Sequence, residues 1–103
     1  MPKPPQLNDE QRLAAREKAA EARRVRSEIK QRLKMGSMTL VELLDDADRD
    51  PTVARMKVLA AIESLPGVGK VTARRTMESI GIAESRRLSG LGPQQRKALL
   101  EAF

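Results

Sequence analysis

The sequence lacks histidine, cysteine, tryptophan and tyrosine, and it has one phenylalanine among 103 residues. Without cysteine or histidine it can form no disulfide, no thiolate or imidazole metal site and no histidine-based acid–base pair. Lysines and carboxylates remain, but they have no evident catalytic companion, and the aspartates of residues 45–50 miss the spacing of a calcium loop. We expect a protein that is not an enzyme and takes no cofactor, metal or small-molecule substrate.

Long hydrophobic runs are also missing, since no stretch approaches the roughly 20 apolar residues that a membrane span needs. Residues 1–11 lack the apolar segment of a signal peptide. These absences predict a cytoplasmic protein with no membrane partner.

Charge is abundant: 33% of the residues are charged, the formal net charge is +6 and the sequence pI is about 10.3. Two basic stretches, residues 9–34 and 51–103, flank an acidic one, residues 35–50. A small chain with such a positive balance is typical of proteins that bind nucleic acid.

Local signals divide the chain into three segments, of which the first two are a short lead and a long helix. Residues 1–8 hold three of the six prolines and are predicted to be a disordered lead. Asn8 and Gln11 form a capping box for a long basic helix, residues 9–36, which ends at Gly36. Only the second half of this helix has an apolar stripe, so the first half is predicted to project as an arm. The stripe consists of Ala22, Val25, Ile29 and Leu33.

Residues 37–103 are predicted to form a small helical domain. Thr39 and Glu42 make a second capping box, Asp50 and Pro51 start a third helix, Lys70 to Ser79 form a fourth, and Gly92 with Pro93 starts the last. No alternating strand pattern is present. The expected fold is all-α: a long helix packed on a helix-hairpin-helix-like domain of about four short helices. The buried face of the third helix is expected to comprise Val53, Met56, Leu59, Ala60 and Ile62.

The most informative motif is a segment that we call the glycine turn, residues 64–71. Gly67 and Gly69 flank one apolar residue just before a helix start, where exposed backbone N–H groups and the helix dipole suit an anion. A Cβ at either glycine would hold a phosphate away from those amides. The alternative is that the glycines only permit a tight turn. The string resembles the hairpin of helix-hairpin-helix DNA-binding proteins, and its candidate residues are Ser64, Leu65, Pro66, Gly67, Val68, Gly69, Lys70 and Val71.

A second candidate element is the arginine loop, residues 82–92. Two adjacent arginines offer planar donors to phosphate oxygens or to a minor groove. Leu88 and Leu91 are expected to pin the loop to the core, and the alternative is a solvated charge pair on a connector. Its candidate residues are Ile82, Ser85, Arg86, Arg87, Leu88, Ser89, Gly90 and Gly92.

A third candidate is a basic stripe along the long helix. On a helical wheel its members share one narrow side, whereas the glutamates occupy a different side. Segregated charge favours a second DNA surface, while helix propensity alone or a docking site for a protein partner are the alternatives. The stripe consists of Arg12, Arg16, Arg23, Lys30 and Lys34, and Arg74 and Arg75 are added as candidates for the same second surface.

From the region of Gln11 to Leu100 the chain resembles the actinobacterial integration host factors, on residues 56–58, 65–70 and 86–92. The resemblance implies a long N-terminal helix on a helix-two-turn-helix domain. It also implies a monomeric nucleoid-associated protein that binds duplex DNA with little sequence preference, compacts or bends it, and supports recombination, replication or transcription. The family's phosphate-gripping turn and its second DNA-contacting element, a lid, fall on the glycine turn and on residues 82–93. Mycobacterial members have an arginine where this chain has Ser89, which implies weaker binding there.

Two other classes share these features. Ribosomal protein S13, which binds rRNA, resembles residues 67–101, but this chain has no long basic tail after them. DNA glycosylases use similar turns, but no base-flipping pocket is expected in this length. A binding preference for duplex DNA over structured RNA would distinguish this chain from an S13-like protein. An assay for base excision would reveal a glycosylase.

Overall fold

A computed structural model describes residues 8–103, and within that range the regular structure is entirely helical. The prediction of an all-α fold is confirmed, and residues 1–7 of the predicted disordered lead lie outside the described range. An isolated antiparallel bridge between Lys57 and Arg87 is the one strand-like pairing described. The helices are α1 (Asp9–Met35), α2 (Leu40–Ala47), α3 (Pro51–Ala54), α4 (Val58–Glu63), α5 (Gly69–Ile80), the short 3₁₀-helix η1 (Leu88–Gly90) and α6 (Pro93–Ala102).

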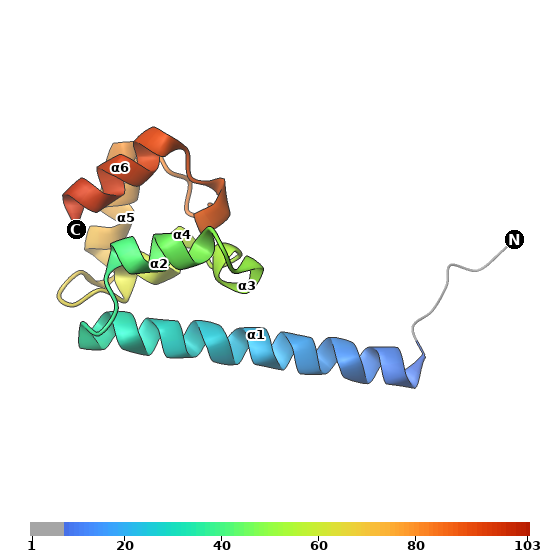
Figure 1. Cartoon of the computed structure of the whole chain (residues 1–103). Coiled ribbons are helices and arrows are strands. Elements are labelled where there is room, and N and C mark those ends of the chain that lie inside the picture. The colour runs from blue at the N-terminus through green and yellow to red at the C-terminus, as the bar shows by residue number, and fades with distance from the viewer. Residues whose placement is uncertain (1–7) are drawn as a thin grey trace, which may run out of the picture.

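The long helix α1 begins and ends as its sequence predicts. The Asn8 side chain accepts from the Gln11 backbone N–H at 2.7 Å, and the Gln11 side chain accepts from the Asn8 N–H at 3.0 Å. Gly36 closes the helix in the left-handed conformation with φ 75°. Every residue from 8 to 21 is exposed, whereas Ile29 and Leu33 are buried. The first half of α1 therefore extends past the body as an arm, as predicted (Figure 1).

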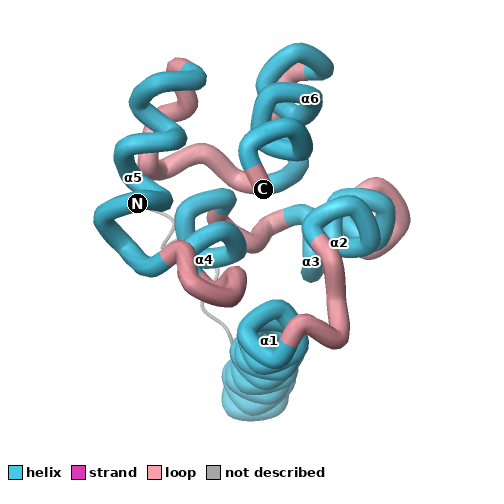
Figure 2. The backbone as a smooth tube through the Cα atoms, turned by 90° about the vertical axis from the view of Figure 1, so that its left-hand side faces the viewer, coloured by secondary structure: helices cyan, strands magenta, loops and turns pink. Residues whose placement is uncertain are grey.

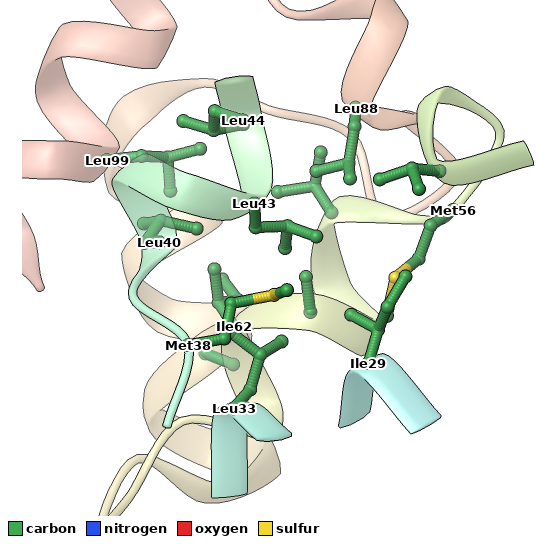
Figure 3. Packing of buried hydrophobic residues seen from close by; sticks show 14 of the residues in the cluster. Ile29, Leu33, Met38, Leu40, Leu43, Leu44, Met56, Ile62, Leu88 and Leu99 are labelled. Atoms are coloured by element: carbon green, nitrogen blue, oxygen red, sulfur yellow. The ribbon is translucent and has the colours of Figure 1, made fainter. Parts of the chain in front are cut away.

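A single apolar cluster joins the second half of α1 to the other helices (Figure 3). Leu33 is fully buried and faces the body, where it lies among side chains from α2, α4 and the connection before α2. The view along α1 shows α4 beside it and α6 on the side of the body away from it (Figure 2). Aliphatic side chains and methionines build the whole core, which includes Leu33, Met38, Leu43, Leu44, Met56, Val58, Ile62, Met77 and Leu99.

The prediction of one helix from Pro51 through Ile62 is wrong. Two helices, α3 and α4, occupy this range, because Lys57 between them is extended, with φ −71° and ψ 138°. The break lets Val58 donate its N–H to the Arg86 carbonyl and lets Leu88 donate to the Met56 carbonyl, both at 2.9 Å. Tertiary pairing with the arginine loop thus overrides the local helical pattern. Five short α-helices follow α1 instead of about four.

Candidate nucleic-acid interface

The glycine turn joins α4 to α5. Gly67 and Gly69 have φ values of 75° and 69°, which residues with a Cβ rarely adopt. Nothing lies within 4 Å of the position that a Cβ would take at either glycine. The backbone is therefore bare on its outer side, and the first N–H groups of α5 have no partner within the helix. A group that approaches from solvent can reach these amides directly.

An open depression of about 540 Å³ lies at the glycine turn. Lys70 lines it from the start of α5, and Lys34 lines it from α1. The positive end of the α5 dipole and two lysines favour an anion at this position. Glu63 is the one acidic residue in the lining, which consists of Lys34 and residues 63–70.

Side chains of the glycine turn divide into anchors and exposed groups. Leu65 and Val68 pack against the core, and the Ser64 hydroxyl donates to the Ala60 carbonyl at 2.8 Å. Pro66, Lys70 and Val71 are exposed. The backbone of the turn and the Lys70 side chain therefore face solvent, whereas the anchors Leu65 and Val68 pack inward.

The arginine loop is anchored as predicted, because Leu88 is buried and Leu91 packs against the core. Ile82 is also buried, at 4% exposure. Its side chain and that of Leu88 therefore contact the core and are not available to a ligand. Ser85, Arg87, Ser89 and Gly90 are exposed, Arg86 is half-buried, and Gly92 forms the cap of α6.

The two loop arginines differ in what they contact. Arg86 Nη1 donates to the Gly90 carbonyl at 2.7 Å, and a Cβ at Gly90 would stand 2.8 Å from Arg86 Cδ. Arg86 is therefore folded over its own loop. Arg87 Nη1 donates to the Arg55 carbonyl at 2.5 Å, which holds the exposed guanidinium against the junction of α3 and α4. A guanidinium has five N–H donors, so each arginine keeps donors for a ligand.

The short helix α4 sets the distance between the two elements. Its first residue, Val58, is hydrogen-bonded to the arginine loop, and the glycine turn begins at its last turn. At 1.5 Å per residue, the seven steps from Lys57 to Ser64 span about 10 Å. Both elements therefore lie at opposite ends of one rigid spacer.

The basic stripe does not form one separate surface. Lys34 lines the depression at the glycine turn, and Lys30 lines a second depression beside Arg87. Arg12, Arg16 and Arg23 are exposed, and Arg12 and Arg16 lie on the projecting arm. The stripe thus begins on the arm and ends beside both candidate elements.

Two other arginines of the helices, Arg24 and Arg74, are already paired. Arg24 bonds to Glu21, and this hydrogen bond, with the charges of Glu21 and Glu28, raises the pKa of Arg24. Arg74 Nε lies 3.3 Å from a Glu84 carboxylate oxygen, so Arg74 is engaged on α5, whereas its neighbour Arg75 is exposed.

Sequence reasoning missed three basic residues of this region, Arg26, Arg55 and Lys57, which line the depression beside Arg87. Arg26 lies next to the basic stripe on the helical wheel, so a broader definition of the stripe in the sequence analysis would have included it. Neither Arg55 nor Lys57 was predicted as a site residue, although Lys57 lies in the segment 56–58 that carries the family resemblance, because the break between α3 and α4 that presents them depends on the arginine loop.

Among residues 8–103, no helix is long and apolar enough to cross a bilayer. The same residues contain no group of three or more acidic side chains placed to hold a metal ion.

The helix pair α4 and α5, joined by the glycine turn and supported by α1, is the arrangement of a helix-two-turn-helix protein. Residues 33–103 match the family model of the S13-like H2TH domain. This match covers the body and begins at Leu33, near the end of α1.

Full-length relatives extend the comparison to the arm. The chain is 58% identical to the integration host factors of Mycobacterium tuberculosis and Mycolicibacterium smegmatis, over 96% of its length and 94% of theirs. It is 50% identical to that of Streptomyces coelicolor, over 96% of its length and 92% of the relative's. A solved structure, sIHF bound to an 8-base-pair palindromic DNA, superposes with a TM-score of 0.82 at 49% identity, over 84% of this chain and 98% of that one. The chain belongs to the mycobacterial and Streptomyces integration host factor family.

Proposed function

We propose that this protein is a nucleoid-associated architectural protein that binds duplex DNA through its phosphate backbone, with little sequence preference. The observation that carries the proposal is the open glycine turn at one end of α4, with its bare amides and the lysines Lys34 and Lys70, and the exposed Arg87 of the arginine loop at the other end. Backbone amides and cationic side chains suit phosphate oxygens, and contacts to phosphate carry no direct sequence information. The relative sIHF, which is similar over 84% of this chain, has been solved with DNA bound. The proposal includes no catalytic step.

Salt dependence of DNA binding tests this proposal. If the glycine turn and the arginine loop engage about four to six phosphates, log K against log salt should have a slope of about −4 to −5. Replacing Arg86 and Arg87 by alanine should flatten the slope by about two units. Fluorescence anisotropy of a labelled random-sequence duplex, from low to moderate salt, measures both slopes.

The matched control for the loop variant is Lys97→Gln, an exposed change on α6, away from α1. It should shift the slope by much less than one unit. Absence of duplex binding by the parent protein, or a slope that the loop variant leaves unchanged, contradicts the proposal.

The S13-like name of the matched domain favours a second candidate, binding of structured RNA by the same turn. The relatives that match 96% of the chain, arm included, are integration host factors, which supports DNA instead. Competition between a duplex and a folded RNA hairpin of equal length decides: preferential displacement by the hairpin would favour the RNA-binding alternative.

We further propose that a monomer holds a second duplex through the arm. Arg12 and Arg16 are exposed on one side of α1, beyond the body. The arm variant Arg12→Gln/Arg16→Gln should reduce capture of a labelled duplex on an immobilised duplex about tenfold, because two phosphate contacts are lost. Binding to a single duplex should remain. The control is Lys18→Gln/Arg32→Gln, which removes two charges from α1 outside the stripe, and equal loss with both variants contradicts the second-duplex proposal.

A further inference from the structure

A second depression, of about 320 Å³, lies where α1, the α3–α4 junction and the arginine loop meet. We call it the basic pocket. Five of its seven lining residues are basic and none is acidic. The lining comprises Arg26, Lys30, Arg55, Met56, Lys57, Ala60 and Arg87.

These five positive charges have no acidic partner in the part of the chain that the structure describes. The ion pairs of residues 8–103 use Arg24, Arg49, Arg74 and Arg96 instead. Like charges gathered in one depression repel each other, and the attraction of an anion placed between them offsets that repulsion. The pocket therefore has an electrostatic preference for a negatively charged group.

The pocket is held in shape by the fold. Lys57 and Arg87 are paired in the antiparallel bridge, and Arg87 Nη1 donates to the Arg55 carbonyl. Met56 and Val58, which flank Lys57, are 1% and 0% exposed and anchor this short ladder in the core. The Arg87 guanidinium and the backbone that carries Arg55 and Lys57 are thus held in place before any ligand arrives, which lowers the entropic cost of binding.

The basic pocket and the depression at the glycine turn are both lined by residues of α1. Lys30 lines the former and Lys34 the latter, one helical turn apart on α1 and about 6 Å apart along its axis. The spacer α4 gives about 10 Å between Lys57 and Ser64. Phosphates on one DNA strand recur every 3.4 Å along the duplex axis, so sites about 6–10 Å apart are close enough to engage nearby phosphates of one duplex.

We propose that the basic pocket binds a backbone phosphate of the same duplex that the glycine turn binds, and that Arg26, Arg55 and Lys57 are DNA-binding residues with Lys30 and Arg87. This inference rests on the proposed function. It makes one continuous phosphate track from the glycine turn along α4 and α1 to the arginine loop. The ligand is a phosphate group, and its two possible sources are the DNA backbone and a free phosphorylated molecule.

The pocket variant Arg55→Gln/Lys57→Gln tests the proposal, with the charge-preserving variant Arg55→Lys/Lys57→Arg beside it. Both positions are exposed, so the fold is expected to persist, which circular dichroism checks. The pocket variant loses a charge-assisted phosphate contact, so it should bind duplex about 10-fold more weakly or worse at moderate salt. Its slope of log K against log salt should flatten by about one unit. The charge-preserving variant should keep most of the affinity. The single change Lys57→Gln is compared with Lys97→Gln on α6.

A second readout does not depend on charge. Because the chain has no cysteine, Lys57→Cys, Lys34→Cys and Lys97→Cys each give a single thiol for a benzophenone maleimide photocrosslinker. Irradiation with a duplex should crosslink DNA to the first two proteins and not to the third. Crosslinking at Lys34→Cys alone, or a pocket variant that binds like Lys97→Gln, overturns the inference while the proposed function stands. Failure of the parent protein to bind any duplex would instead overturn the proposed function itself.

Titration of the free protein with pyrophosphate separates the two phosphate sources. Weak pyrophosphate binding, together with a flattened DNA slope in the pocket variant, supports the backbone phosphate. Tight pyrophosphate binding that the pocket variant loses, with an unchanged DNA slope, would assign the pocket to a free phosphorylated molecule and overturn the inference.

Discussion

Replacing Leu33 by alanine is expected to lower the free energy of unfolding by about 2–5 kcal/mol, the range for truncating a fully buried leucine. Leu33 is 0% exposed and, with Ile29, forms the buried face that holds α1 on the body. The cavity would lie between α1 and the α2 and α4 helices, where relaxation requires movement of a whole helix. A small domain is stable by only about 5–15 kcal/mol, so this one change removes a large share.

Urea unfolding followed by far-ultraviolet circular dichroism measures this effect, because the chain has no tryptophan or tyrosine for fluorescence. The matched control is Leu13→Ala on the arm, where the side chain is 58% exposed and its truncation should leave the stability nearly unchanged. Equal destabilisation by the two variants, or a loss below about 1 kcal/mol for Leu33→Ala, would contradict the packing of α1 described above.

Local signals predicted the helix ends because their chemistry is local. Both capping boxes are formed, with Thr39 accepting from the Glu42 N–H at 3.2 Å and Asn8 accepting from Gln11. Asp50 caps α3 ahead of Pro51, accepting from the Thr52 N–H at 2.9 Å. Each of these contacts spans two or three residues, so the sequence alone contains the information that positions it.

The break in the helix predicted from Pro51 could not be found in this way. Val53, Met56, Leu59 and Ile62 fit helical spacing, and no glycine or proline interrupts them. Lys57 is extended because its neighbours bond to residues about 30 positions later in the chain. Helix propensity is a weak preference that such tertiary pairing overrides.

The candidate site likewise has one part that local sequence predicted and another part that depends on tertiary packing. The two glycines predicted a turn with positive φ, and both adopt it, because backbone geometry of this kind has a direct residue signature. The basic pocket assembles side chains from three separate segments, so its existence depends on the packing of α1 against α4 and the arginine loop. Arg86, predicted as a donor to phosphate, folds over Gly90 within its own loop, a local contact that was not predicted from the sequence.

Substituting glutamate for Gly69 should reduce duplex affinity about 100-fold or more. A Cβ at this position points into open space on the outer side of the turn, where a phosphate would approach the amides. Each lost charge-assisted hydrogen bond costs about 1.5–3 kcal/mol, or roughly 10- to 100-fold in affinity, and the new carboxylate adds repulsion. The variant Gly69→Ala, which adds only the Cβ, should fall between the parent and Gly69→Glu.

Backbone strain must be separated from the loss of phosphate binding, because Gly69 has φ 69° and any residue with a Cβ is strained there by about 1–2 kcal/mol. Gly81 provides the matched control: its φ is 87°, nothing lies within 4 Å of its Cβ position, and it lies at the opposite end of α5. Gly81→Ala should therefore show a similar drop in melting temperature by circular dichroism, with unchanged anisotropy titrations. If folded Gly69→Glu binds duplex within twofold of Gly81→Ala, the glycine turn is not a phosphate site. A large loss confined to the Gly69 variants is the result that the open amides of α5 predict.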